Sequence, residues 1–192
     1  MRLATLSPLL LAFSLAACGS APTRDYVLQP RPVSPASTAP AAQGPKIVVR
    51  HVVIPAQLDR PGYVSYGADG ALNIGHRSRW GAPFGRMIQS VIAADLGSAL
   101  PGRVQSPGDP APSGPHWTLA VTIRHFAASH GGRVLLRADW SMIGAHGASL
   151  ASSTTSLSHQ AGSDRPEDVV PLMDEMLARL SQSIAQAVSP LN

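Results

Sequence analysis

The side chains that could do chemistry in this sequence are seven histidines, a serine- and threonine-rich stretch, and one cysteine. A metal site shows in a sequence as His, Cys, Asp or Glu residues at a recognised ligand spacing. The closest histidine pair, His125 and His130, straddles the end of an expected strand and a Gly-rich turn, so it does not share a helix face. The sequence therefore predicts no metal site.

Nucleophilic catalysis has no support from motifs either. The serines and threonines of residues 152–158 lack the Gly-x-Ser-x-Gly turn that presents a hydrolase nucleophile. Gly144 and Gly147 are expected in a hairpin loop rather than in a phosphate-binding loop. The sequence predicts a protein that is not an enzyme and binds no cofactor.

The cysteine, Cys18, has the surroundings of a lipid-attachment site. Arg2 precedes an apolar run over residues 9–17, which is shorter than the about 20 residues that a membrane-spanning helix needs. Small residues before Cys18 make residues 1–17 typical of a secretory signal peptide. Leu-Ala-Ala-Cys resembles the lipobox of bacterial lipoproteins, in which the thiol receives a diacylglyceryl group and cleavage leaves the cysteine first. The alternative is a secreted protein with a free thiol.

Lipidation of Cys18 would decide where the protein is attached. Each buried methylene of an acyl chain contributes about 0.8 kcal/mol, so two glyceryl-linked chains and an N-acyl chain would hold the protein permanently in lipid. Gly19 follows the cysteine, not aspartate. By resemblance to the sorting rule of enterobacterial lipoproteins, this favours the periplasmic face of the outer membrane.

The composition excludes other classes of partner and membrane protein. Without Arg2 the chain has fourteen basic and eleven acidic residues, and Lys46 is its only lysine. Scattered arginines, with no basic run interleaved with aromatic residues, argue against nucleic-acid binding. No other apolar stretch approaches the length of a membrane span. Residues 18–192 suffice for one domain with a sizeable core.

Residues 18–45 are expected to form the lipidated N-terminus, a short strand and a linker. Tyr26 and Leu28 bound a short apolar triplet that favours a strand. Residues 30–45 are rich in Pro, Ala and Ser, a composition that predicts an extended linker because it buries little. If the triplet joins the sheet, this linker is instead a long loop back to the domain of residues 46–192.

The periodicity of residues 46–192 predicts a sheet and two main helices. We expect strands at 47–54, 62–66, 71–74, 103–105, 117–124, 134–142 and 150–158, and helices at 84–100 and from about 164 to 188. The last three strands form an antiparallel meander with one apolar face. Asp164 and Glu167 have the spacing of a capping box, and Pro171 lies either in the first turn or at a kink. The expected fold is α+β, an antiparallel or mixed β-sheet with both helices on one face, a two-layer sandwich.

Two stretches carry residues that a scaffold does not require. Leu58, Asp59 and Arg60 lie in a proline-bounded loop between strands, and Arg79 and Trp80 come just before a helix. These five residues are our candidate partner-binding residues. The alternatives are a solvated ion pair in the loop and a tryptophan that caps the core.

The same stretches carry a resemblance to a known family. The chain has Tyr-x-Leu at Tyr26, Ile-Pro-x-x-Leu-Asp-Arg-Pro from Ile54 and Arg-Trp-x-x-Pro-Phe from Arg79. In this order they resemble the ABC-type transport auxiliary lipoproteins, the paraquat-inducible PqiC (YmbA) family. The alternating strand that ends near Trp140, after Phe126, is similar too.

The resemblance covers most of residues 26–188. The chain departs from the family pattern in residues 30–45, at Gly81 and Phe84, and at Pro171. Because the early Tyr-x-Leu belongs to the family fold, the resemblance favours a short strand there, with residues 30–45 as a loop.

The resemblance implies a non-catalytic lipoprotein that works with an MCE-domain protein and inner-membrane transporter components in lipid transport. Alone or as a homo-oligomer ring, it would hold the outer end of the periplasm-spanning MCE component at the outer membrane, anchored in lipid through Cys18. The alternative is a periplasmic lipid-binding carrier that encloses an acyl chain between sheet and helices. Phe84, Met87, Met173 and Met176 could line such a cavity, although apolar helix stripes are more often core.

Overall fold

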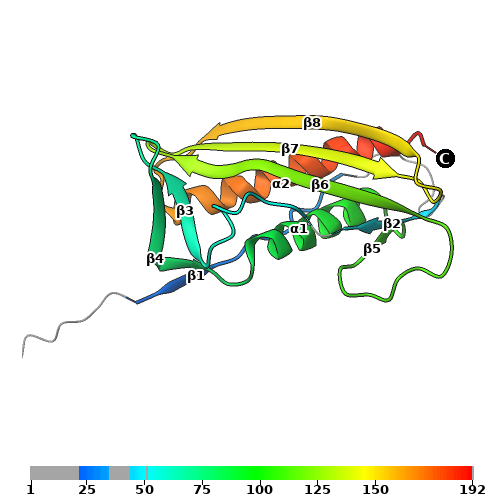
Figure 1. Cartoon of the computed structure of the whole chain (residues 1–192), viewed down its shortest axis with the longest axis horizontal. Helices are drawn as coiled ribbons and strands as arrows, with labels where there is room; N and C mark the ends of the chain where they lie inside the picture. The colour runs from blue at the N-terminus through cyan, green and yellow to red at the C-terminus, as the bar shows by residue number, and fades with distance from the viewer. Residues whose placement is uncertain (1–21, 35–43, 51, 192) are drawn as a thin grey trace, which may run out of the picture.

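A computed structural model describes residues 22–34, 44–50 and 52–191 of the chain. Figure 1 shows a mixed eight-stranded sheet with two helices packed on it, which confirms the predicted α+β fold. The elements in chain order are β1 (Arg24–Tyr26), β2 (Lys46–Val49), β3 (Gly62–Tyr66), β4 (Leu72–Trp80), α1 (Phe84–Ala99), β5 (Val104–Gln105), β6 (His116–Ser129), β7 (Arg133–Ile143), β8 (Ser149–Gln160) and α2 (Pro166–Val188).

The sheet is built around β6, its longest strand. One edge of β6 pairs in parallel with β2 near its start and with β3 at its end, and the other edge pairs antiparallel with β7. β5 extends the sheet beyond β2, while β4 and then β1 extend it beyond β3. β8 pairs only with β7 and forms a free edge, with its side chains exposed or half-buried.

The core lies between the sheet and the helices. Every second residue is buried along β7 and along β6 up to Ile123, as expected when one face of a strand packs against other elements, and the alternation breaks at the irregularity after Ile123. The buried residues of these two strands are Trp117, Leu119, Val121, Ile123, Phe126, Ala127, Ala128, Val134, Leu136, Ala138, Trp140 and Met142. The apolar stripes of α1 and α2 complete the same cluster.

The first two strands have other bounds than those predicted, and β4 continues to Trp80, well beyond the predicted strand at 71–74. β1 ends at Tyr26, whose carbonyl accepts a hydrogen bond from the Gly81 N–H at 2.8 Å, so the strand lies two residues earlier than expected. β2 ends at Val49, and beyond it only Val53 makes an isolated bridge, to Thr122. The strand predicted over residues 47–54 is therefore split.

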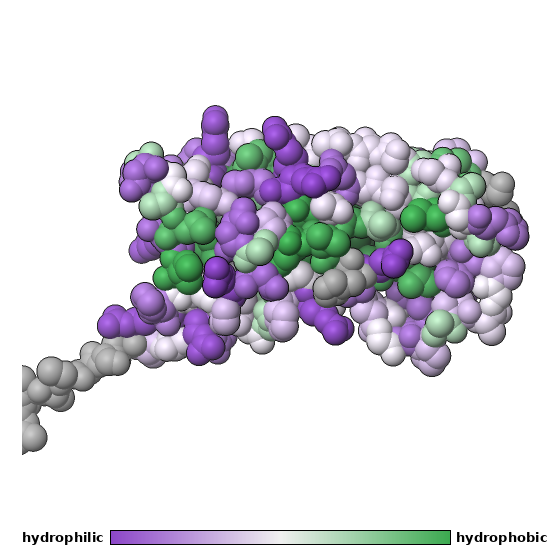
Figure 2. Space-filling view, viewed as in Figure 1, coloured by the Kyte–Doolittle hydropathy of each residue, from purple (hydrophilic) through white to green (hydrophobic). Residues whose placement is uncertain are grey.

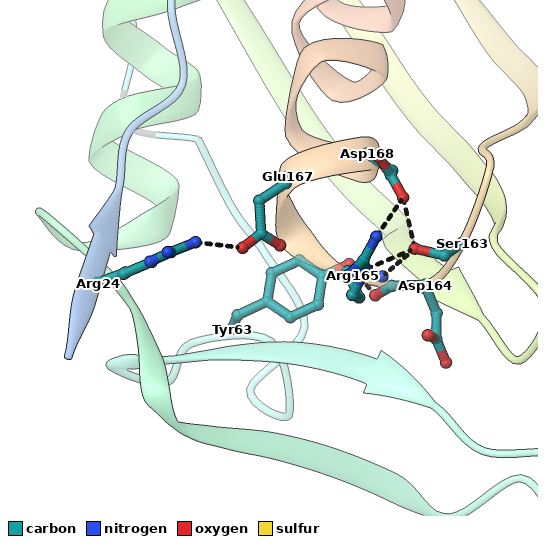
Figure 3. Close-up of polar contacts among 7 residues, drawn as sticks. All are labelled: Arg24, Tyr63, Ser163, Asp164, Arg165, Glu167 and Asp168. Atoms are coloured by element: carbon teal, nitrogen blue, oxygen red, sulfur yellow. Dashed lines mark hydrogen bonds and ion pairs between the residues drawn. The ribbon is translucent and has the colours of Figure 1, made fainter. Parts of the chain in front are cut away.

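The predicted capping box of α2 is wrong. Pro166 takes the first helical position, so Arg165 is the N-cap residue, and its guanidinium has no acceptor with which to cap the helix. Pro171 consequently lies inside the helix, beyond its first turn. Figure 3 shows the start of α2, where Ser163 donates to the Asp168 carboxylate.

The short strand β1 is fastened to this same end of α2. Arg24 Nη1 donates to Glu167 Oε1 at 2.8 Å (Figure 3), and the Tyr63 hydroxyl reaches the Asp164 carbonyl at 3.4 Å. Glu167 also lies in the first turn of α2, where a negative charge favours the helix dipole. β1, the described strand nearest to Cys18 in the sequence, is thus joined to the sheet through β4 and to the helix layer through α2.

Residues 28–33, which we call the strap, continue from β1 across the two helices. The Gln29 N–H donates to Asp174 Oδ1 on α2 at 3.0 Å, and the Arg31 N–H donates to Asp95 Oδ1 on α1 at 2.8 Å. The Val33 N–H donates to Ser98 Oγ at 2.9 Å. Residues 30–34 are therefore not the extended linker that composition predicts, because helix side chains satisfy their backbone N–H groups.

The strap places a carboxylate in the protein interior. Asp95 is 0% exposed, and its Oδ2 has no partner among the described residues. Burial raises the pKa of Asp95 from 3.8 to about 7, against the Arg31 hydrogen bond, which lowers it, and with a further rise from the charge of Asp174. Burial also raises the pKa of Asp174. Two helix acids thus accept hydrogen bonds from the strap, and burial disfavours the charged form of each.

We expect Asp95→Asn to flatten the dependence of stability on pH. Between pH 4 and about 7 the unfolded aspartic acid releases its proton and the folded one retains it. The free energy of unfolding of the wild type should therefore fall as pH rises through this range. Asparagine keeps an oxygen acceptor for Arg31 and does not titrate, so the variant should lose this component.

Thermal unfolding midpoints measured by circular dichroism from pH 4 to 8 would check this expectation. Asp109→Asn, in an exposed loop, is the matched control and should follow the wild-type slope. Equal slopes for wild type and Asp95→Asn would contradict the proposed titration.

Candidate functional site: the hollow beside helix α1

The loop between β2 and β3 turns tightly around one buried leucine. The Leu58 N–H donates to the Pro55 carbonyl at 2.9 Å, and the Asp59 N–H donates to the Ala56 carbonyl at 3.3 Å. The Leu58 side chain is only 2% exposed and packs in the core. It therefore fixes the loop and is not itself available to a partner, which corrects our expectation for this residue. Asp59 is exposed.

Trp80 joins this loop to the sheet and to α1. The backbone N–H of Trp80 donates to the Pro61 carbonyl at 2.8 Å. Its ring stacks on Phe84 with centroids 4.7 Å apart, and Phe84 stacks on Phe126 at 5.8 Å. Trp80 is 8% exposed, so most of its ring belongs to the core, in line with the reading of a core-capping tryptophan.

Three adjoining hollows surround the first turns of α1, and together we call them the α1 groove. The first, of about 360 Å³, is lined by Asp59, Arg60, Pro61, Trp80, Ala82 and Pro83. The second, of about 310 Å³, is lined by Val52, Val53, Ile54, Asp59, Pro83, Gly85 and Arg86. The third, of about 180 Å³, is lined by Leu28, Pro30, Ala82, Arg86, Met87, Ser90 and Val91. Each pair of hollows shares at least one lining residue, so the three are neighbours.

The five predicted partner-binding residues thus separate into three groups. Asp59, Arg60 and Trp80 line one hollow, although they come from different elements. Leu58 is in the core. Arg79 lies opposite Asp25 of β1 and, as the neighbour of an inward-facing residue on the same strand, points to the other face of the sheet.

The α1 groove offers polar groups around an apolar floor. Arg60, Arg86 and Asp59 supply exposed charges at its rim, and Pro83 and Trp80 supply apolar surface. The first turn of α1 has no acidic residue and no side-chain cap, so Asp59 is the acidic residue that lines the hollows at this positive end of the helix dipole. Such an arrangement suits recognition of a partner segment.

Within the described part of the chain, no three His, Cys, Asp or Glu side chains come together as a metal site would require. None of the described helices is long and apolar enough to cross a membrane. Cys18 lies outside the described residues, so its lipidation stays a prediction from sequence.

The residues proposed for a lipid cavity are packed in the core. Phe84, Met87, Met173 and Met176 are between 0 and 7% exposed and belong to a single hydrophobic cluster. They fill space between the layers with protein side chains. This packing favours a solid core over an acyl-chain binding site.

Sequence reasoning missed the strap and its two acids. Asp95 interrupts the apolar stripe of α1, between Ile92 and Leu96, both fully buried. A buried carboxylate in such a stripe requires a hydrogen-bond donor, which is the signal that could have located the strap.

Comparisons with known proteins cover nearly the whole chain. The sequence profile of a family described as "ABC-type transport auxiliary lipoprotein component" matches residues 26–185. The Escherichia coli (strain K12) protein named "Intermembrane transport lipoprotein PqiC" is 25% identical over 181 residues, which are 94% of this chain and 95% of that protein. The protein of the same name from Shigella flexneri matches equally.

Two solved structures share the fold. An uncharacterized protein superposes with a TM-score of 0.71 at 22% identity, over 88% of this chain and 99% of the other. A protein from Xanthomonas campestris gives a TM-score of 0.68 at 16% identity, over 86% and 94%. The profile match spans most of the chain and contains every element from Tyr26 into α2. The chain therefore belongs to the ABC-type transport auxiliary lipoprotein family.

Proposed function

We propose that this protein is a non-catalytic outer-membrane lipoprotein of an MCE-type lipid transport system, where it docks the periplasm-spanning MCE component. The observation that carries the proposal is the similarity to an intermembrane transport lipoprotein over 94% of the chain. Inner-membrane transporter components would supply the energy and the lipid, and this subunit would supply attachment at the receiving membrane.

Attachment would come from Cys18. The apolar run, the small residues before the cysteine and the family's lipoprotein character support a lipid anchor. Gly19 supports release to the outer membrane. The domain would then face the periplasm from that membrane, in the path of a partner that crosses the compartment.

The α1 groove is our candidate surface for the MCE partner. Its rim combines the exposed charges of Asp59 and Arg60 with the apolar surface around Trp80, as docking sites with a few oriented polar groups do. Leu58 and the stacked Trp80 and Phe84 rings hold this surface rigid. A pre-organised surface loses little entropy when it binds.

Native mass spectrometry of the delipidated protein would distinguish docking from lipid carriage. Because the described core is filled with side chains, we expect lipid-free protein that captures the MCE-domain protein of the same bacterium. A monomer with bound phospholipid would overturn docking in favour of the carrier. The same spectra would report whether the protein forms a ring of identical copies.

Arg60→Glu should weaken capture of the MCE-domain protein by about tenfold, a change that corresponds to about 1.4 kcal/mol. The side chain is exposed at the rim of the hollow, so the domain should remain folded. Arg133→Glu, an equally exposed reversal at the start of β7 and outside the groove, is the control. Equal affinity of the two variants in biolayer interferometry would exclude the groove as the docking surface.

Removal of the anchor should separate folding from function. Cys18→Ala, exported behind an ordinary secretory signal peptide, should yield a folded protein that fractionates with soluble periplasmic proteins. Lipid transport should be lost, because the docked component would no longer be held at the membrane. Normal resistance of the envelope to detergents in this strain would show that anchoring is dispensable.

A further inference from the structure

We propose that β4 and the turn before it form a surface that rests on the lipid headgroups beside the anchor. This inference depends on the proposed lipidation of Cys18, but not on the docking of an MCE protein. The partner is a bilayer surface that contains anionic phospholipid.

Two exposed apolar side chains lie near the start of β4. The described residues contain five exposed large hydrophobic side chains, and two of them are Leu72 and Ile74. Leu72 is 38% exposed and Ile74 is 42% exposed. Figure 2 shows hydrophobic surface over β3 and β4, bordered by hydrophilic surface toward β1. Leu72 and Ile74 lie two positions apart on one strand and together present a small exposed apolar surface.

The same strand supplies positive charge. β4 carries His76, Arg77 and Arg79 and no acidic residue. Among the described residues, neither arginine of β4 forms an ion pair. Two acids lie near β4: Asp69 in the turn before the strand and Asp25 opposite Arg79 near its end. Exposed guanidinium groups and exposed apolar side chains on one strand suit phosphate headgroups above the acyl boundary.

The length of the chain limits the distance between the anchor and the strand next to β4. Cys18 precedes Arg24 by six residues, which span at most about 20 Å when fully extended. Arg24 pairs with Ser78, so β4 is the strand next to β1 in the sheet. Arg24 bonds to Glu167, and the strap bonds to both helices, so β1 has a fixed position relative to the rest of the domain.

Most of β4 also has a free edge toward the outside. β1 pairs with Ser78, Arg79 and Trp80, and no other strand of the described residues pairs with the preceding part of β4 on that side. Backbone groups at a sheet edge need hydrogen-bond partners, which water and polar headgroups provide. A second copy of the chain could also pair there, and the experiment below separates the two occupants.

The test uses the full lipoprotein in vesicles of phosphatidylethanolamine and phosphatidylglycerol. Because the lipidated Cys18 has no free thiol, a new cysteine can be labelled alone with an environment-sensitive fluorophore. Ala71→Cys places the label beside Leu72, and His146→Cys places it in the β7–β8 turn, at the opposite end of the sheet in Figure 1. Both positions are exposed.

We expect lipids with a nitroxide headgroup to quench the label at position 71 at least threefold more than the label at position 146. Arg77→Glu combined with Arg79→Glu should reduce this difference, while circular dichroism remains unchanged. Equal quenching at both positions would overturn the proposal. Shielding of the label at position 71 that persists in detergent would also overturn it, in favour of pairing between copies.

The outcomes are separable from those of the proposed function. A protein without lipid at Cys18 would fail to float with the vesicles at all, which removes the basis of both ideas. Loss of MCE capture with normal quenching would refute docking alone. Normal MCE capture with equal quenching at both positions would refute the membrane-facing surface alone.

Discussion

The fold depends on the length of β6. The edge of β6 opposite β7 is longer than either strand that pairs with it: β2 pairs with the start of β6 and β3 with its end. The segment between β2 and β3 fills the gap with single contacts: the Arg50 N–H donates to the Leu119 carbonyl at 2.9 Å, and the Val53 N–H donates to the Val121 carbonyl at 3.1 Å. The Asp59 loop therefore emerges at a fixed place beside α1.

This constraint explains why the candidate site is where it is. A continuous strand along β6 would leave no loop to line a groove, whereas an unattached loop would present no fixed surface. The buried side chain of Leu58 holds the loop in the core. The backbone N–H of Trp80, at the end of β4, donates to the loop at the Pro61 carbonyl. Rigid strands on both sides with one irregular segment between them are a common way to position binding residues.

Local patterns predicted the meander and both helices because each pattern lies within one element. The alternation of β6 and β7 and the helical stripe that starts at Phe84 need no knowledge of distant residues. The strap could not be predicted this way. Its acceptors lie 64 residues away, at Asp95, and 145 residues away, at Asp174. Likewise, the sequence presents Arg79 and Trp80 as one motif. Only the strand conformation shows that their side chains point to opposite faces of the sheet.

The edge strand β8 has a consequence for the way this protein is made. Its sequence of twelve residues contains no lysine, arginine, aspartate, glutamate or proline, which are the residues that usually keep sheet edges apart. α2, which follows β8 in the chain, contacts both β7 and β8. Until α2 folds back, a newly made chain therefore presents an uncharged edge and an uncovered apolar face together. Docking of the C-terminal helix is thus the folding step that covers the apolar face beside this edge, and a chain that lacks it is exposed to aggregation.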